Sequence, residues 1–174
     1  MLPDATRLLQ HHFGYDGFRP LQQRVLAPVF EGRDVLAVLP TGGGKSLCYQ
    51  VPALLASGPT IVVSPLIALM QDQVARLHRQ GIAAVTLGGD LAPGARDAAL
   101  REMTAGRLPL LYVSPERLRG LAPLIAARGI RIARLAIDEA HCVVEWGHDF
   151  RPAYRRIGER SEEHTSELQS LRTI

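Results

Sequence analysis

The sequence contains little cysteine, tryptophan or lysine, and it has no long apolar run. Its 174 residues include two cysteines, one tryptophan and one lysine, whereas nineteen are arginine. No stretch approaches the roughly 18 apolar residues of a membrane-spanning helix, so none is predicted. Cys48 and Cys142 stand apart, outside any metal-ligand spacing. We therefore expect no zinc site, and two reduced, mostly buried cysteines.

The charge balance is mildly basic, with a formal net charge of +3. This value permits a polyanionic partner but does not require one, because a solvated arginine-rich surface gives the same balance. Asp4 and His11–His12 lie where a secretory signal would need a basic start and an apolar core. We therefore expect a cytoplasmic protein.

Short apolar runs alternate with longer amphipathic stretches along the chain. The runs are nearly continuous in apolar character, as in strands covered on both faces, and they span residues 34–39, 60–64, 83–87, 108–114 and 134–138. Helices are expected near residues 4–12, 20–31, 45–56, 66–80, 93–105 and 115–128. The alternation predicts an α/β fold with a parallel β-sheet and helices on both faces.

The last fourteen residues, 161–174, are polar and offer no further strand. We interpret them as a non-native tail, such as translated vector sequence, with a native solvated tail as the alternative. The expected organisation is a helical segment at 1–32, an incomplete nucleotide-binding lobe at 33–160, and this tail.

The single lysine lies in "LPTGGGKSLCYQ", which nearly matches the phosphate-loop pattern G-x-x-x-x-G-K-[ST], with Leu39 at the first Gly position. Glycines without Cβ atoms let backbone N–H groups approach phosphate, and a compact lysine charge suits the β- and γ-phosphates. The serine hydroxyl is a candidate Mg²⁺ ligand. The alternative is a glycine-rich turn with an incidental lysine. The predicted phosphate-binding residues are Thr41, Gly42, Gly43, Gly44, Lys45 and Ser46.

An acidic motif, "LAIDEAH", ends the last apolar run. Asp138 is placed to hold Mg²⁺ beside the nucleotide phosphates, and Glu139 to orient and polarise the attacking water. We expect His141 to link the nucleotide site to the rest of the machinery. On its own, the acidic pair would equally fit an ordinary strand-to-loop junction.

Taken together, these motifs resemble the RecQ family of ATP-dependent DNA helicases in superfamily 2. The resemblance covers about residues 8–160. It implies a RecA-like P-loop domain, the first lobe of a 3′-to-5′ helicase of DNA repair and recombination. Besides the loop and the "DEAH" box, the segments that carry it are "FGYDGFRPLQ", "VVSPLIALMQDQV", "LLYVSPERL" and "WGHDFRPAY".

The resemblance also assigns roles at the base. It implies that Gln22 hydrogen-bonds the adenine edge, since an amide offers one donor and one acceptor. Tyr15 would stack on the adenine and Arg19 would support it. Simple surface packing is the alternative for Tyr15 and Arg19.

A DNA path is implied as well. Ser64 and Pro65, with Ser114 and Arg117, lie just past strand ends and would contact DNA phosphates, although a helix N-cap role is the alternative for both serines. In the aromatic-rich loop, stacking on bases would tolerate any sequence. Val144 and Glu145 depart from the family's usual "S-Q-W" there. The implied loop residues are Trp146, His148, Phe150 and Arg151.

The implied ligands are ATP, Mg²⁺ and DNA, both single-stranded and at duplex junctions, and the implied location is the bacterial nucleoid. The family's motor also needs a second RecA-like lobe. We expect the 174-residue chain to bind nucleotide weakly and not to unwind DNA. Two alternatives stay open: another superfamily-2 motor, such as an RNA helicase, and a nucleotide-binding module without turnover.

Overall fold

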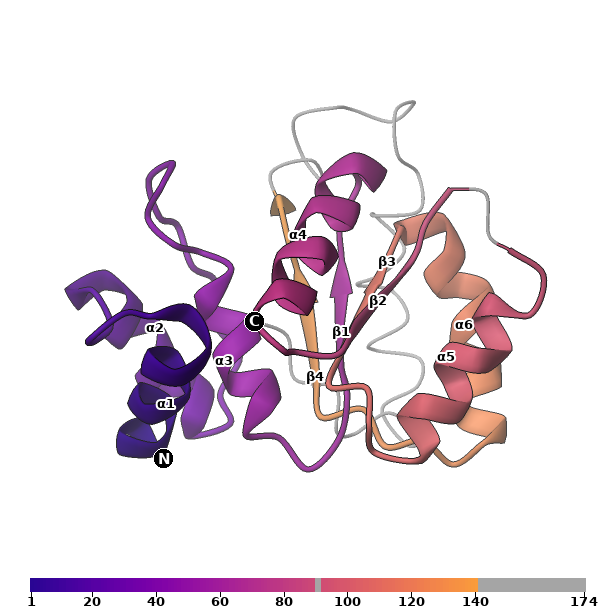
Figure 1. Ribbon diagram of the computed structural model, residues 1–174, viewed down its shortest axis with the longest axis horizontal. Coiled ribbons are helices and arrows are strands. Elements are labelled where there is room, and N and C mark those ends of the chain that lie inside the picture. The colour runs from indigo at the N-terminus through magenta and orange to yellow at the C-terminus, as the bar shows by residue number, and fades with distance from the viewer. Residues whose placement is uncertain (90–91, 141–174) are drawn as a thin grey trace.

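The computed structural model describes residues 1–89 and 92–140. Its elements alternate as the sequence predicts from β1 onward (Figure 1). In chain order they are α1 Leu2–Leu8, the π-helix η1 Leu9–Phe13, α2 Pro20–Phe30, α3 Leu47–Leu54, β1 Thr60–Val63, α4 Ile67–Arg79, β2 Ala84–Leu87, α5 Ala95–Thr104, β3 Leu110–Val113, α6 Pro115–Ala127 and β4 Arg134–Ile137.

The four strands form one parallel sheet in the order β2-β3-β1-β4. In register, Thr60 lies opposite both Leu110 and Arg134. Each pair of strands consecutive in sequence is joined through a helix, which keeps them parallel. All four carboxyl ends therefore meet at one edge, the upper edge in Figure 1.

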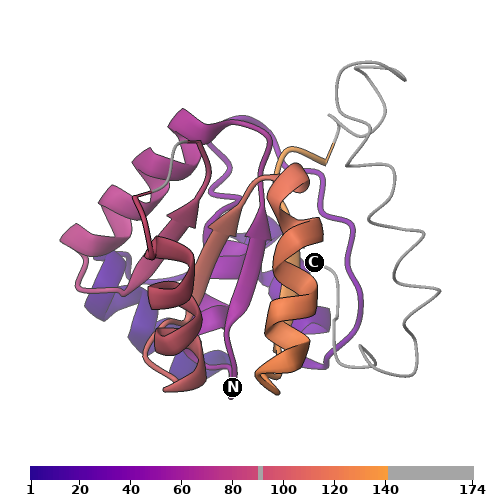
Figure 2. The same ribbon diagram turned by 90° about the vertical axis from the view of Figure 1, so that its right-hand side faces the viewer.

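Helices cover both faces of the sheet, as predicted (Figures 1 and 2). Successive side chains of a strand point to opposite faces. Ile61 and Val63 pack in one core with residues of α5 and α6, while Val62 packs in another with residues of α3 and α4. Because both faces are buried, the strands lack polar alternation.

The N-terminal helices add a third cluster against α3. Leu9, Leu26 and Val51 are each fully buried there. This packing joins residues 1–30 to the lobe and brings the start of α2 close to the loop before α3, whose contacts are given below. Among the described residues, no helix has the length and apolar character needed to cross a membrane.

The predicted strand at 34–39 is wrong. Residues 33–40 belong to no helix or strand, and the side chains of Leu36 and Val38 are 85% and 90% exposed. A strand needs a hydrogen-bonded neighbour. The edge strand β4 pairs with β1, and no described strand pairs with its other side. A cavity of about 750 Å³ lies between residues 34–39 and residues 137–140, so the apolar run is not paired with β4.

Candidate nucleotide-binding site

The loop before α3 folds tightly around its glycines. Gly42 and Gly44 have φ of +74° and +75°, in the left-handed region that favours glycine. The Gly43 N–H donates to the Pro40 carbonyl at 2.9 Å, and a Cβ on Gly43 would lie 2.8 Å from that oxygen. A Cβ on Gly44 would collide with the Gln22 amide. The loop conformation thus depends on all three glycines.

Two residues from the start of α2 hold this loop. The Gln22 Nε2 donates to the carbonyls of Gly43 and Gly44 at 3.3 and 3.1 Å, and its Oε1 accepts from the Arg19 N–H at 2.8 Å. The Arg19 guanidinium donates to the Gly42 carbonyl at 2.7 Å. Gln22 is 3% exposed. Its amide therefore binds the loop backbone in this structure.

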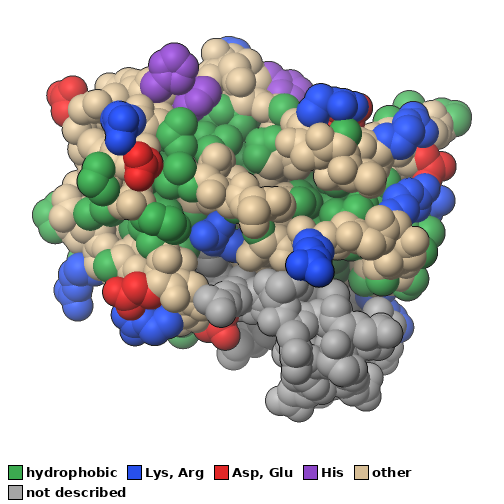
Figure 3. All heavy atoms as spheres, turned by 90° about the horizontal axis from the view of Figure 1, so that it is seen from below, with side chains coloured by type: hydrophobic (Ala, Val, Ile, Leu, Met, Phe, Trp, Pro, Cys, Tyr) green, Lys and Arg blue, Asp and Glu red, His purple; other side chains and the backbone are tan. Residues whose placement is uncertain are grey.

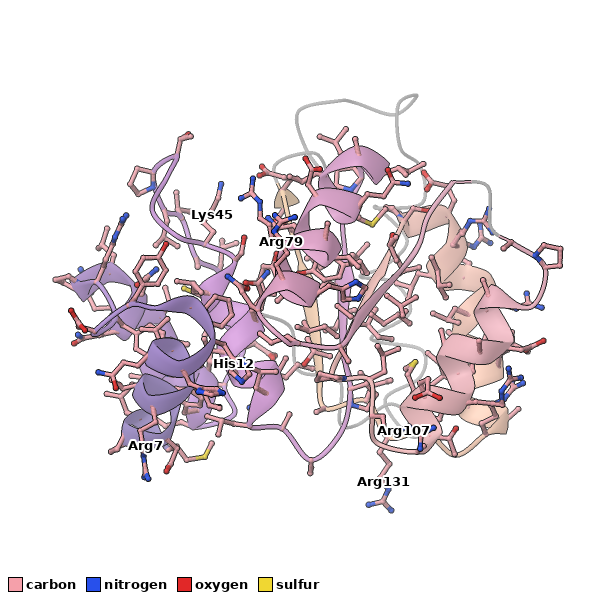
Figure 4. The ribbon with its side chains drawn as sticks, in the orientation of Figure 1. Arg7, His12, Lys45, Arg79, Arg107 and Arg131 are labelled. Atoms are coloured by element: carbon pink, nitrogen blue, oxygen red, sulfur yellow. The ribbon has the colours of Figure 1, made fainter. Side chains whose placement is uncertain are left out.

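Lys45 lies at the end of the loop, near the upper edge of the sheet (Figure 4). Its Nζ is 3.7 Å from Oε1 of Glu139, the residue after Asp138 at the end of β4. Glu139 has φ of +54°, uncommon for a residue with a side chain, and strain of this kind is typical of functional sites. Its N–H donates to Asp138 Oδ1 at 3.0 Å. The sequence prediction that the loop and the acidic pair share one site is consistent with this geometry.

The Asp138 carboxyl is mostly buried at the carboxyl end of β4. Its backbone N–H donates to the Val63 carbonyl at 2.8 Å, which continues the β1–β4 ladder. Burial raises the pKa of Asp138, and the neighbouring Glu139 charge raises it further. The Tyr49 hydroxyl donates to Asp138 Oδ2 at 3.5 Å. A buried carboxylate with a raised pKa is typical of a functional site.

Tyr49 and Tyr112 form a buried aromatic pair beneath the carboxylate, with ring centroids 6.4 Å apart in an edge-to-face arrangement. Burial raises the pKa of Tyr112 to about 12 and that of Tyr49 well above its usual range. Both hydroxyls therefore keep their protons at neutral pH and can donate. The Ser46 side chain lowers the pKa of Tyr49 and partly offsets the effect of burial, so the Tyr49 hydroxyl lies near both predicted Mg²⁺ ligands.

Sequence reasoning missed the polar side chains behind Ser46. Gln73 Nε2 donates to Ser46 Oγ at 3.3 Å, and Gln50 Nε2 donates to Gln73 Oε1 and to the Tyr112 hydroxyl, both at 3.0 Å. The signal that could have found them is Gln50, a glutamine among the apolar residues of α3, because a buried amide needs a hydrogen-bond partner.

The donor set fits Mg²⁺. Ser46 and Asp138 carry hard oxygen atoms, and Mg²⁺ is commonly bound by one or two carboxylates together with substrate phosphates and water. Among the described residues no three His, Cys, Asp or Glu side chains cluster as a metal cage. An ion held here would therefore depend on nucleotide oxygens for part of its coordination.

Of the remaining predicted residues, Ser64 and Arg117 follow β1 and β3 at the same edge, and Ser114 is the N-cap of α6. Tyr15 is 55% exposed, and the Thr41 side chain is also exposed. Ser64 is buried after β1, and its Oγ has no hydrogen-bond partner within residues 1–89 and 92–140. The exposed Arg117 donates to the Gly89 carbonyl. The N-cap of α4 is Leu66, so the N-cap alternative for Ser64 is wrong.

Eight residues singled out in the sequence lie outside the described residues. They are His141, Cys142, Val144, Glu145, Trp146, His148, Phe150 and Arg151.

The opposite end of the sheet has a different character. Seen from there, basic side chains are scattered among apolar and neutral atoms (Figure 3). Arg107 and Arg131 lie at this end, far from Lys45 (Figure 4), and Arg107 pairs with Glu102 at 2.7 Å.

Comparison with known proteins identifies the family of this chain. The family model described as DEAD/DEAH box helicase matches residues 19–172. The chain is 46% identical over 158 residues to the ATP-dependent DNA helicase RecQ of Bacillus subtilis, covering 90% of this chain and 27% of that protein. It is 47% identical over 152 residues to that of Synechocystis, covering 86% of this chain and 32% of that protein. The chain thus spans about a quarter to a third of these relatives.

Solved structures support the fold alone. The structure of Mss116p bound to single-stranded RNA and AMP-PNP matches with a TM-score of 0.68 at 20% identity, over 97% of this chain and 37% of that one. The RecA-like parallel sheet is therefore confirmed. The family match shows that the chain belongs to the DEAD/DEAH box helicase family, and the sequence identities show that it is similar to RecQ helicases.

Proposed function

We propose that this chain is the ATP-binding lobe of an ATP-dependent, 3′-to-5′ DNA helicase of RecQ type. The observation that carries the proposal is the approach of Lys45 to Glu139 beside Asp138 at the carboxyl edge of the sheet. In open parallel sheets this edge is where ligands bind. The identity to RecQ proteins supports DNA as the substrate.

Each residue of the site would have a separate role in phosphoryl transfer. Lys45 would pair with the β- and γ-phosphates as a compact charge, and the loop glycines would let backbone N–H groups approach. Because the Gly43 N–H is bonded to Pro40 here, nucleotide would have to replace that bond. Mg²⁺, held by Ser46 and Asp138, would neutralise charge on the phosphates. Glu139 would orient and polarise the attacking water.

The adenine site would be built from the start of α2. Tyr15 is exposed enough to stack on a base, and Arg19 and Gln22 join that segment to the phosphate loop. For Gln22 to bind the adenine edge, its amide would have to exchange at least one loop carbonyl for the base. Adenine binding would thereby alter how the loop is held.

DNA would pass over the same edge of the sheet. Ser64 and Arg117 follow β1 and β3 at that edge. Arg117 is exposed and could contact a phosphate, whereas the buried Ser64 hydroxyl would first have to be uncovered. Trp146, His148, Phe150 and Arg151 would provide stacking and charge in the aromatic-rich loop, and His141 would link them to the nucleotide. A second RecA-like lobe would complete the motor, which would act on chromosomal DNA in repair and recombination at the nucleoid.

The test uses the full-length protein that contains this segment. ATP hydrolysis would be measured with single-stranded DNA and with RNA, and unwinding with a 3′-tailed duplex. We expect stimulation by DNA and strand separation, and neither unwinding nor strong stimulation with the 174-residue chain alone. Stimulation by RNA only would favour an RNA helicase, and absence of turnover with either would favour a binding module.

A further inference from the structure

Four polar side chains form one connected network behind the phosphate loop. Gln73 of α4 donates to Ser46 Oγ at 3.3 Å and accepts from Gln50 of α3 at 3.0 Å. Gln50 also donates to the hydroxyl of Tyr112 on β3 at 3.0 Å. The network thus joins three elements of the lobe to a single hydroxyl of the loop.

The chemistry of the network fixes which way the Gln73 amide is turned. Gln50 is 4% exposed and Tyr112 is fully buried, so neither polar group can turn to water without cost. In this structure the Gln50 nitrogen faces Gln73, and because that nitrogen can only donate, Gln73 presents its oxygen to it. The Gln73 N–H groups are then left to face Ser46.

A serine hydroxyl has one proton and two lone pairs. The N–H of Gln73 occupies one lone pair of Ser46, which leaves the other lone pair for a cation. We propose that Gln73 is a positioning residue that orients Ser46 Oγ for the divalent cation. This inference rests on the proposed function, because it assumes that Ser46 is a ligand.

Partners of metal ligands typically change metal affinity about 10- to 100-fold when mutated. The test measures free Mn²⁺ by electron paramagnetic resonance in titrations of the full-length protein with saturating AMP-PNP. Gln73→Met keeps the size of the side chain and removes the hydrogen bonds. We expect Mn²⁺ affinity to fall about tenfold, while AMP-PNP binding in EDTA stays unchanged.

The matched control is Gln71→Met, because Gln71 is exposed on the same helix two residues away. We expect it to bind Mn²⁺ like the wild type. Gln73→Asn serves as a second variant if the methionine variant folds poorly, since it stays polar but is too short to keep both bonds. It should show the same loss of affinity.

A double-mutant cycle with Ser46→Ala separates the outcomes. If Gln73 acts through Ser46, Gln73→Met should add less than about twofold to the loss caused by Ser46→Ala. An equal further loss in that background, or wild-type affinity of the Gln73 variants, would overturn the positioning role alone. Unchanged Mn²⁺ affinity in Ser46→Ala would overturn the proposed metal site and the positioning role with it.

Discussion

The Nζ of Lys45 lies 3.7 Å from Oε1 of Glu139, so the phosphate loop and the end of β4 meet through one cation and one carboxylate. Both side chains are partly exposed, at 40% and 24%. Exposed pairs contribute only about 0 to 1 kcal/mol to stability. The significance of this contact is therefore positional rather than energetic, because it places the cation of the loop beside the acidic pair.

Replacement of Lys45 should remove this cation without unfolding the lobe. In the full-length protein we expect Lys45→Ala to lower ATP hydrolysis by about 10²- to 10³-fold, the effect of losing one preorganised electrostatic group. Lys45→Arg should not restore the rate, because the planar guanidinium fits a tight loop poorly. Steady-state hydrolysis assays measure both. An arginine variant with wild-type turnover would contradict the proposed role.

Glu139→Gln should separate binding from hydrolysis. The amide keeps the size of the side chain but cannot act as a base, so we expect turnover to fall about 10²- to 10⁴-fold while nucleotide binding persists. Glu102→Gln on α5 is the control, since Glu102 pairs with Arg107 at the other end of the sheet. Fluorescent-nucleotide titration and hydrolysis assays provide the two readouts. Parallel loss of both would argue for a merely structural glutamate.

Gly42→Ala and Gly44→Ala form a matched pair in the loop. Both residues have left-handed backbones, which costs a residue with a Cβ about 1 to 2 kcal/mol. The Cβ at position 42 meets open space, whereas that at position 44 collides with the Gln22 amide. We expect the larger fall in Tm for Gly44→Ala, measured by thermal unfolding of the purified chain. Equal falls in Tm would show that the left-handed backbone, and not the collision with Gln22, accounts for the loss of stability.

Gln22→Glu should loosen the loop from α2. The carboxylate can still accept from the Arg19 N–H, but it cannot donate to the carbonyls of Gly43 and Gly44. Leaving buried groups unpaired costs about 1 to 3 kcal/mol, and about 1 kcal/mol lowers Tm by roughly 2 to 4 °C at this size. Nucleotide affinity should fall as well. Gln23→Glu is the control, because its amide bonds to Phe18 instead.

Asp138→Asn should stabilise the nucleotide-free chain at neutral pH. Burial raises the pKa of Asp138 above its ordinary 3.8, so the folded state disfavours the carboxylate. Its contribution to stability is therefore most favourable below that value and is lost as pH rises through the folded pKa. We expect a higher Tm for the asparagine variant at pH 7 and a shrinking difference as pH falls toward 3.8. A difference independent of pH would contradict this account.

Much of the lobe could be predicted from local pattern. Glycines, a lysine and a serine in sequence specify a phosphate loop because their requirements are local: left-handed backbone, a compact charge and a hydroxyl. Apolar runs of strand length alternating with amphipathic stretches predicted the four strands and the helices between them. The failure at 34–39 shows the limit, because a strand also needs a partner edge that the pattern cannot supply.

The sequence by itself determined which side chains are available for nucleotide chemistry, in the loop at 39–46 and the acidic pair Asp138–Glu139. Only the tertiary structure decided how these groups are held. The β1–β4 pairing brings Asp138 to the loop, Gln22 binds the loop carbonyls, and Gln73 reaches Ser46 from α4. These contacts join residues far apart in the chain, so they depend on how buried faces pack, which no local spacing of residue types encodes.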